Sequence, residues 1–181
     1  MKILQIQKNK IFFENGAEFS LSKSTIKEYK LEESMEIDRD TYMYLAESSA
    51  LSFSYWLLGK KDYSKKELEI KLLTKYKEKT IISKVINQLN DMCYLNDYDF
   101  AESFISSHKN CGKKKLEFHL VSKGIDISIV KELLEDNEEN EINSIQKIWE
   151  KMGDKDYSKK IESLMRKGFE YGTIKKAVKN L

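Results

Sequence analysis

Residues 109–125, KNCGKKKLEFHLVSKGI, contain the pattern that decides the fold of this chain. A basic run at 113–115 precedes apolar residues at helical spacing, which are Leu116, Leu120 and Val121. Gly124 follows them, at the place where the residue after a helix takes a left-handed backbone that glycine adopts without strain. The stretch therefore predicts an amphipathic helix with a basic first turn and a glycine stop.

The same pattern occurs three times in the chain. An offset of 48 residues brings Leu72 onto Leu120, and a further 44 residues bring Leu120 onto Leu164. The preceding segments match at the same offsets, as the sets Phe53, Trp56 and Leu57, then Ala101, Phe104 and Ile105, then Ile145, Ile148 and Trp149. The match has one flaw, because Leu68 and Leu116 meet Lys160. A period of this size predicts tandem helical repeats, each of which buries its apolar face on its neighbour.

The repeated apolar and glycine positions are interpreted as structural. Stacked repeats need equivalent core residues, so the expected core includes Phe53, Trp56, Phe104, Ile105, Ile148 and Trp149. Gly124 and Gly168 are expected to end their helices in the left-handed region. The first repeat has Tyr76 at this position, so its second helix must end in a different way.

The predicted fold class is mainly α, with three tandem three-helix repeats that form an elongated curved array behind a small N-terminal β module. Short β-prone runs flank Asn15-Gly16, which is a strong hairpin signal. The expected helices span residues 40–58, 64–76, 79–92, 97–108, 112–123, 126–136, 141–152, 157–167 and 171–180. The expected domains are the β module with one short helix at 1–39 and repeats at 40–95, 96–138 and 139–181.

Composition supports a helical chain with solvated faces. Of the 181 residues, 34% are charged and 40% hydrophobic, and proline is absent, which favours long amphipathic helices over a loop-rich fold. The two cysteines do not suggest a disulfide framework, and no signal peptide or membrane-spanning run is visible. We therefore expect a cytoplasmic protein.

No catalytic constellation stands out. His108 and His119 with Cys93 and Cys111 form a conceivable soft-metal set, but their spacing is not that of a tight helical ligand pair. We interpret them as surface or interface residues. No serine lies in a nucleophile elbow and no glycine-rich phosphate loop follows a strand, so we expect neither an enzyme nor a bound cofactor or metal.

The basic residues are concentrated in the second helices of the repeats. Residues 60–79 carry 8 basic and 4 acidic side chains, residues 109–123 carry 5 and 1, and residues 155–179 carry 8 and 3. A single lysine-rich face commonly serves solubility only. Three such faces on equivalent helices could instead follow a long acidic surface. Aromatic residues do not interleave them as a platform for stacking single-stranded bases would require.

The chain resembles the bacterial regulatory RecX family over essentially its whole length, and the resemblance rests on three motifs. CYLNDYDFA at residues 93–101 resembles a family segment that has glycine at the first position and ends in Phe-Ala. The stretch 112–125 resembles the glycine-basic helix that ends in Lys-Gly-Ile/Val. LMRKGF at residues 164–169, with IKKA at 174–177, resembles the C-terminal Arg/Lys-Gly-Phe unit. The chain departs from the family at Cys93, and at residues 61–64, where the family usually has Arg-Pro-Arg-Ser.

The resemblance implies a cytoplasmic modulator of the RecA recombinase. Such a protein binds in the groove of the RecA–DNA filament across protomers and inhibits recombinase and co-protease activity, with weak contact to DNA phosphates and no membrane partner. We expect a monomer. By charge and motif position, the expected partner-binding residues are Lys61, Lys65, Lys66, Lys113, Lys114, Lys115, Arg166, Lys167, Lys175 and Lys176. The alternative is a helical nucleic-acid-binding module that acts without RecA.

Overall fold

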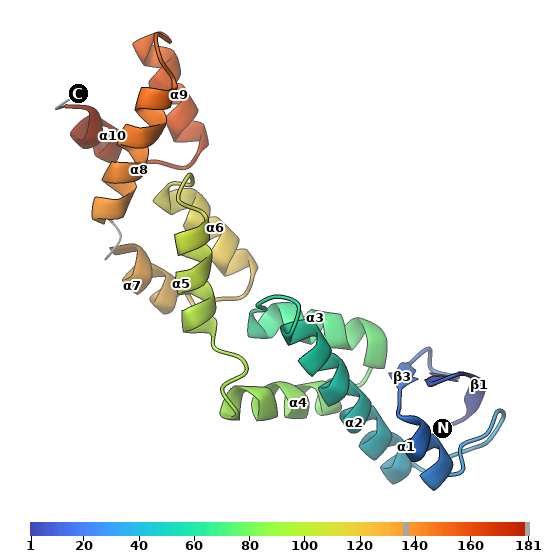
Figure 1. The fold of residues 1–181 in the computed structure, drawn as a ribbon. Coiled ribbons are helices and arrows are strands. Elements are labelled where there is room, and N and C mark those ends of the chain that lie inside the picture. Colours follow the sequence, from blue (N-terminus) through green and yellow to red (C-terminus); the bar gives the residue numbers. More distant parts are fainter. Residues whose placement is uncertain (136–137, 180–181) are drawn as a thin grey trace. The chain divides into compact units, whose positions relative to one another are not determined.

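The computed structural model describes residues 1–135 and 138–179, and within them the chain forms three strands and ten helices (Figure 1). The strands are β1 (Ile3–Gln7), β2 (Lys10–Phe13) and β3 (Glu18–Ser20). The helices are α1 (Lys23–Glu28), α2 (Arg39–Leu58), α3 (Lys65–Tyr76), α4 (Lys79–Asp91), α5 (Asp97–Ser107), α6 (Lys113–Ser122), α7 (Ile127–Glu135), α8 (Glu138–Lys151), α9 (Tyr157–Arg166) and α10 (Tyr171–Val178). They belong to two compact units, Met1–Asn96 and Asp97–Leu181.

The first unit begins with an antiparallel sheet in the order β1-β2-β3. Gly16 lies in the turn between β2 and β3 with φ of 78°, which agrees with the predicted hairpin. Ser22 caps α1 by accepting a hydrogen bond from the Thr25 amide. The predicted N-terminal β module with one short helix is therefore present.

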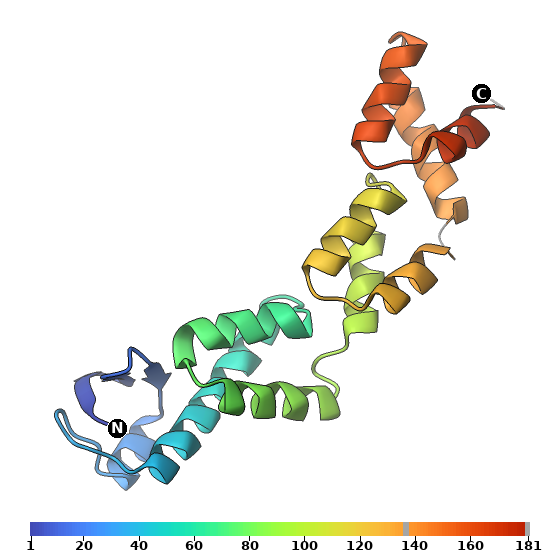
Figure 2. The ribbon, with the colours of Figure 1, turned by 180° about the vertical axis from the view of Figure 1, so that it is seen from behind.

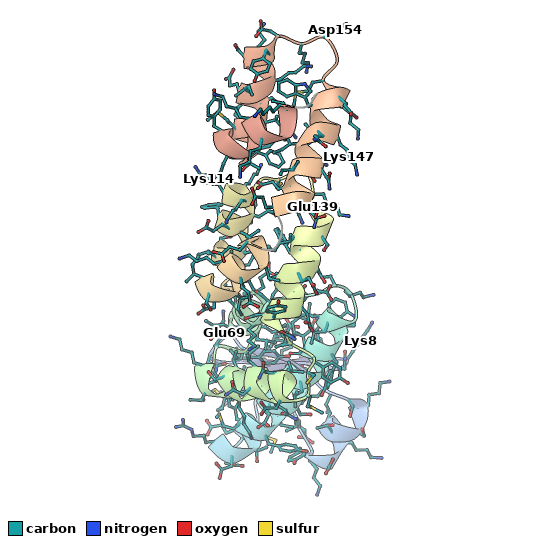
Figure 3. All side chains as sticks on the ribbon, turned by 90° about the vertical axis from the view of Figure 1, so that its left-hand side faces the viewer. Lys8, Glu69, Lys114, Glu139, Lys147 and Asp154 are labelled. Carbon is teal, nitrogen blue, oxygen red and sulfur yellow. The ribbon has the colours of Figure 1, made fainter. Side chains whose placement is uncertain are left out.

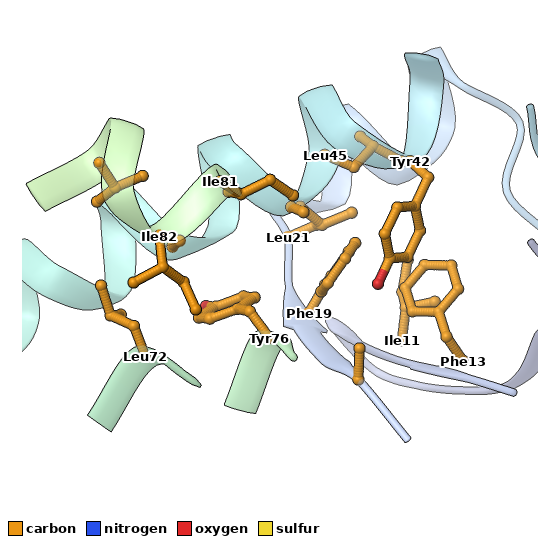
Figure 4. Packing of buried hydrophobic residues seen from close by; sticks show 14 of the residues in the cluster. Ile11, Phe13, Phe19, Leu21, Tyr42, Leu45, Leu72, Tyr76, Ile81 and Ile82 are labelled. Atoms are coloured by element: carbon orange, nitrogen blue, oxygen red, sulfur yellow. The ribbon is translucent and has the colours of Figure 1, made fainter. Parts of the chain in front are cut away.

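The sheet and helices α2 to α4 share one hydrophobic core (Figure 4). Phe13 and Phe19 from the sheet each lie 5.1 Å, centroid to centroid, from the ring of Tyr42 on α2. Tyr76 on α3 is fully buried and shares a 3.0 Å hydrogen bond with Ser49 on α2. Burial raises the pKa of the Tyr76 phenol to about 12, so this hydroxyl stays protonated and serves as a structural link.

The local sequence explains both ends of α3, although the residue that ends this helix is not a glycine. Ser64 and Glu67 form the capping box that their spacing permits. The left-handed residue after the helix is Lys77, with φ of 64°. Tyr76 can therefore stay helical and turn its ring into the core. Cys93, which stands where the resembling family has glycine, also has a left-handed backbone, with φ of 59°.

The second unit contains two sets of three helices, α5 to α7 and α8 to α10 (Figure 2). Each set has its own buried hydrophobic cluster. Leu120 on α6 and Leu164 on α9 are both fully buried, as is Leu72 on α3 in the first unit. Gly124 and Gly168 follow α6 and α9 with φ of 85° and 90°, as expected for glycine stops. The pattern of residues 109–125 therefore has the structural effect that the sequence predicts.

The mainly α fold class is confirmed. Both ends of each helix from α2 to α10 lie within three residues of their predicted positions. The predicted ends at residues 136 and 180 lie outside the described residues. The tandem-repeat organisation, the curved array and the domain boundaries stay predictions.

Three residues of the apolar pattern are not core residues. Trp56 is 58% exposed, Met165 is 51% exposed and Val121 is 43% exposed. Trp56 lies in the last turn of α2, where its ring stacks on Phe53 and the Lys60 ammonium lies 5.7 Å from the ring centroid. The core interpretation was wrong for Trp56, because helical period selects a face but not how far a neighbouring helix covers it.

Candidate functional site

The structure separates the ten expected binding residues into two groups. Lys61, Lys65 and Lys66 lie in the first unit, at the start of α3 and in the turn before it. The other seven lie in the second unit, as the first turn of α6 (Lys113, Lys114 and Lys115), the end of α9 (Arg166 and Lys167) and the last turn of α10 (Lys175 and Lys176). The Lys114 side chain projects from the start of α6 (Figure 3).

Backbone hydrogen bonds join the start of α6 to the loop after α9. The Gly112 amide donates to the Lys167 carbonyl at 2.9 Å, and the Lys114 amide donates to the Gly168 carbonyl at 3.2 Å. These bonds place the lysines of the first turn of α6 beside the basic end of α9. We call this junction, residues 112–115 with residues 166–169, the basic junction.

The basic junction depends on two glycines that touch each other. A Cβ atom on Gly112 would lie 2.2 Å from the Phe169 nitrogen and 2.3 Å from the Gly168 carbonyl carbon. A Cβ atom on Gly168 would lie 2.5 Å from the Lys115 Cβ. Real Cβ atoms do not approach other heavy atoms this closely, so both positions need glycine for contact. Sequence reasoning identified Gly112 as a helix start and Gly168 as a helix stop, but missed that they meet.

Glu141 on α8 completes the start of α6. Three lysines at a helix N-terminus oppose the positive end of the helix dipole, and Gly112 has no side chain with which to cap the helix. The Glu141 carboxylate supplies the cap by accepting a 2.8 Å hydrogen bond from the Lys113 amide. Sequence analysis missed this residue. The available signal was a predicted helix that begins with glycine and three lysines, and so needs an acceptor from elsewhere.

Burial raises the pKa of the Glu141 carboxyl above its ordinary value of 4.5. The hydrogen bond from the Lys113 amide acts in the opposite direction, while the nearby charges of Glu170 and Glu138 raise the pKa further. At pH values between the unfolded and the folded pKa of Glu141, this carboxyl is protonated in a larger fraction of folded molecules than of unfolded ones. The contribution of Glu141 to stability therefore increases as the pH falls through its folded pKa towards 4.5.

Replacing Glu141 with glutamine tests this sign. Glutamine keeps an oxygen that can accept from the Lys113 amide but does not titrate. The free energy of unfolding of the wild type should rise relative to that of Glu141→Gln as the pH falls from 7 to about 4.5, and level off below that value. Urea denaturation at a series of pH values measures the difference. Glu139→Gln, an exposed change in the same helix, is the control, and a wild-type advantage that grows towards pH 7 would contradict the assignment.

Two of the expected binding lysines form exposed ion pairs inside the second unit. Lys176 lies 2.9 Å from the Glu138 carboxylate, and Lys114 lies 3.7 Å from Glu170. The hydrogen bond from Lys176 lowers the pKa of Glu138, and the same bond raises the pKa of Lys176. Solvent screens exposed pairs of this kind, so they add little to stability and an acidic partner could take over either lysine at small cost.

Aromatic rings lie closer to the basic residues than the sequence pattern indicates. The Lys61 ammonium is 4.3 Å from the centroid of the Tyr63 ring, and the Lys175 ammonium is 4.8 Å from that of Tyr171. Tyr63 is only 9% exposed, so its ring faces are not free for stacking. The sequence did not predict these cation–π contacts, because each lysine reaches its ring through a turn or across one helical turn.

The histidines and cysteines are placed as ordinary side chains. His108 stacks on Phe104 with 3.9 Å between ring centroids, and its Nδ1 lies 2.8 Å from the Phe104 carbonyl oxygen. Within residues 1–135 and 138–179, no group of three or more His, Cys, Asp or Glu side chains is arranged to hold a metal ion. Over the same residues, none of the helices has the length and apolar character needed to cross a membrane.

The fold and the basic junction define a mainly α-helical protein with a small N-terminal sheet and lysine-rich helix ends. A regulatory protein RecX of Clostridioides difficile (strain 630) is 32% identical to it, over 83% of this chain and 74% of the relative. The chain belongs to the RecX family of regulatory proteins.

Further similar proteins carry the same family name. A regulatory protein RecX of Bacillus subtilis (strain 168) is 28% identical over 93% of this chain and 70% of its own length. A crystal structure of RecX from Lactobacillus salivarius matches with a TM-score of 0.66 and 26% identity, over 78% of this chain and 97% of that one. A second RecX crystal structure covers 100% of this chain with a TM-score of 0.65 and 15% identity, and supports the fold alone. No protein-family model matches the sequence.

Proposed function

We propose that this protein regulates the RecA recombinase by binding the RecA–DNA filament in its groove, across neighbouring protomers. Binding inhibits recombinase and co-protease activity by occupancy, without a catalysed reaction, and so modulates DNA repair and recombination. Family membership supports the RecA context. The observation that supports the binding mode is the basic junction, because backbone hydrogen bonds there bring the lysine-rich start of α6 beside the basic end of α9.

Electrostatics favours an acidic, repetitive partner. The basic junction contains five basic residues from the start of α6 and the end of α9, which are Lys113, Lys114, Lys115, Arg166 and Lys167. A filament groove with acidic side chains and DNA phosphate offers such charges at regular intervals. Lysine binds these groups as a point charge and does not need the fixed geometry of an arginine fork.

A titration of a RecA filament on single-stranded DNA tests the proposal. We expect RecA ATP hydrolysis and strand exchange to fall as this protein is added, while its binding to naked DNA stays much weaker than its binding to the filament. Normal RecA activity at saturating protein would contradict the proposal. Strong, steeply salt-dependent binding to naked DNA without any effect on RecA would favour the alternative, a nucleic-acid-binding module that acts alone.

Neutralising the first turn of α6 should weaken inhibition. We expect Lys113→Gln/Lys114→Gln/Lys115→Gln to raise the concentration for half-inhibition by about tenfold or more, since each lost charge contact to a partner is worth roughly 0.5 to 1 kcal/mol. Glutamine creates no new repulsion with Glu141 or Glu170.

The matched control removes three other lysines of the second unit, Lys131, Lys151 and Lys155, and causes the same change in net charge. The control should inhibit like the wild type. Equal inhibition by both variants and the wild type would assign the run at 113–115 to solubility.

A further inference from the structure

Four lysines of the first unit meet around one shallow pocket that the RecA proposal does not use. The pocket has a volume of about 430 Å³, and its lining residues are Lys8, Lys23, Ile26, Lys27, Lys30, Leu31 and Glu32. Lys8 comes from the turn between β1 and β2, whereas the others come from α1 and the segment after it. A 2.9 Å hydrogen bond from the Leu21 amide to the Asn9 carbonyl links that turn to the residues just before α1.

The charges in this four-lysine pocket are not balanced by the protein. Within the described part of the chain, none of the four ammonium groups forms an ion pair with a carboxylate. Glu32 is the one acidic lining residue, so the lining carries a formal charge of +3. Like charges around one pocket repel one another, and a bound anion would relieve that repulsion.

Two of the four lysines stand on backbone that lysine rarely adopts. Lys8 has φ of 57° and Lys30 has φ of 47°, both in the left-handed region. Lys8 lies in the tight turn between β1 and β2 and Lys30 ends α1, positions that glycine or asparagine would occupy at lower cost. Both residues line the same pocket.

Two of the residues that line the pocket are apolar. Leu31 is 6% exposed and Ile26 is partly buried in the core of the first unit. A ligand in this pocket therefore meets several lysines beside a small hydrophobic surface. The lining has no aromatic side chain on which a base could stack, so the lysines favour contact with phosphate groups.

We propose that the four-lysine pocket binds consecutive phosphates of a nucleic-acid strand. The pocket is open and shallow, whereas sites for small molecules enclose most of their ligand, so a polymer that passes across it fits better than a free nucleotide. Lysine suits phosphate because it acts as a point charge. This activity belongs to the N-terminal module and shares no residue with the basic junction.

The test measures binding of a fluorescent oligothymidine of about 15 nucleotides to the full chain by anisotropy, at several salt concentrations. We compare the wild type with Lys8→Gln/Lys23→Gln/Lys27→Gln/Lys30→Gln. Affinity should fall by about tenfold or more at low salt, and the slope of log K against log salt should become shallower by about 3, or roughly 0.7 for each lost phosphate contact. A matched control changes Lys2, Lys79, Lys131 and Lys147 to glutamine, which lie outside the pocket.

A second variant separates binding from folding. Lys8→Gly/Lys30→Gly removes two charges and relieves both left-handed lysines, so its stability should equal or exceed that of the wild type. Its salt slope should still become shallower by about 1.4. Retained affinity in this variant, or an equal loss of affinity in the matched control, would overturn the proposal.

Competitors identify the ligand class. Excess ATP or polyglutamate should displace the oligonucleotide poorly at matched charge concentration. Displacement by ATP at concentrations near the strand's own dissociation constant would assign the pocket to a mononucleotide, and equal displacement by polyglutamate would assign it to an acidic protein; either result overturns the strand assignment. Inhibition of RecA by the pocket variant should stay at the wild-type level, so failure here is distinguishable from failure of the RecA proposal.

Discussion

Gly112→Ala is expected to lower the stability of the second unit by about 2 to 4 kcal/mol, since it combines overpacking with the loss of backbone hydrogen bonds. The new Cβ would lie 2.2 Å from the Phe169 nitrogen and 2.4 Å from the Gly168 oxygen, and both are backbone atoms that no rotamer change can move. The junction must open, which breaks the bonds from the Gly112 and Lys114 amides. For a unit of this size, a loss of this magnitude corresponds to a fall in Tm of roughly 10 to 20 °C.

The cause of this effect is contact and not backbone freedom. Gly112 has φ of −79° and ψ of 166°, a conformation that any residue adopts. Gly172→Ala in α10 is the matched control, because its new Cβ would meet no heavy atom within 4 Å apart from the local backbone of its own helix, and alanine favours helix. It should be neutral or stabilising by about 0.5 kcal/mol. Thermal unfolding followed by circular dichroism measures both variants, and a Gly112→Ala protein that melts with the wild type would show that the junction does not form.

Opening the junction should also reduce inhibition of RecA. Gly112→Ala moves the lysines of α6 away from Arg166 and Lys167 without changing any charge. Inhibition should therefore weaken at a temperature where the variant is still folded, if the shared surface is what binds.

Leu120→Ala is expected to cost about 2 to 5 kcal/mol, the usual range for removing a buried leucine side chain. Leu120 is fully buried within the cluster of α5, α6 and α7. Removing three carbons leaves a cavity that the surrounding backbone can close only in part. Urea denaturation should show a lower midpoint with little change in slope.

The adjacent residue provides the control for Leu120→Ala. Val121 belongs to the same apolar pattern but is 43% exposed, so Val121→Ala should change the free energy of unfolding by no more than about 0.5 kcal/mol. Equal losses for both substitutions would contradict the observed placement of α6. Leu72→Ala and Leu164→Ala, at the matching offsets, should each resemble Leu120→Ala if the three-helix sets are true repeats.

The sequence patterns predicted the secondary-structure elements well but the tertiary contacts poorly. The helices, the glycine stops after α6 and α9, and the capping box of Ser64 and Glu67 all follow from local patterns, because neighbours in sequence form them. The exposure of Trp56 does not, since coverage of the end of α2 depends on where other helices lie.

At the candidate sites, too, local sequence patterns identified residues but not the contacts between distant ones. Charge runs identified the lysines of α6, α9 and α10, but the bond from Lys113 to Glu141 joins residues 28 apart in the chain. The four-lysine pocket gathers Lys8 with residues 23 to 32 across a hairpin turn, and nothing in the local composition of that region, which carries more acidic than basic side chains in residues 1–50, singles it out.

By itself, the sequence determined the helical period, the helix ends and the family motifs of this protein, because backbone propensities and the 3.6-residue repeat act over a few neighbouring residues. Only the tertiary structure decided that Gly112 and Gly168 touch, that Glu141 caps α6, and that four N-terminal lysines share one pocket. Those features depend on the close packing of segments far apart in the chain, where a single methyl group or charge decides whether the surfaces fit.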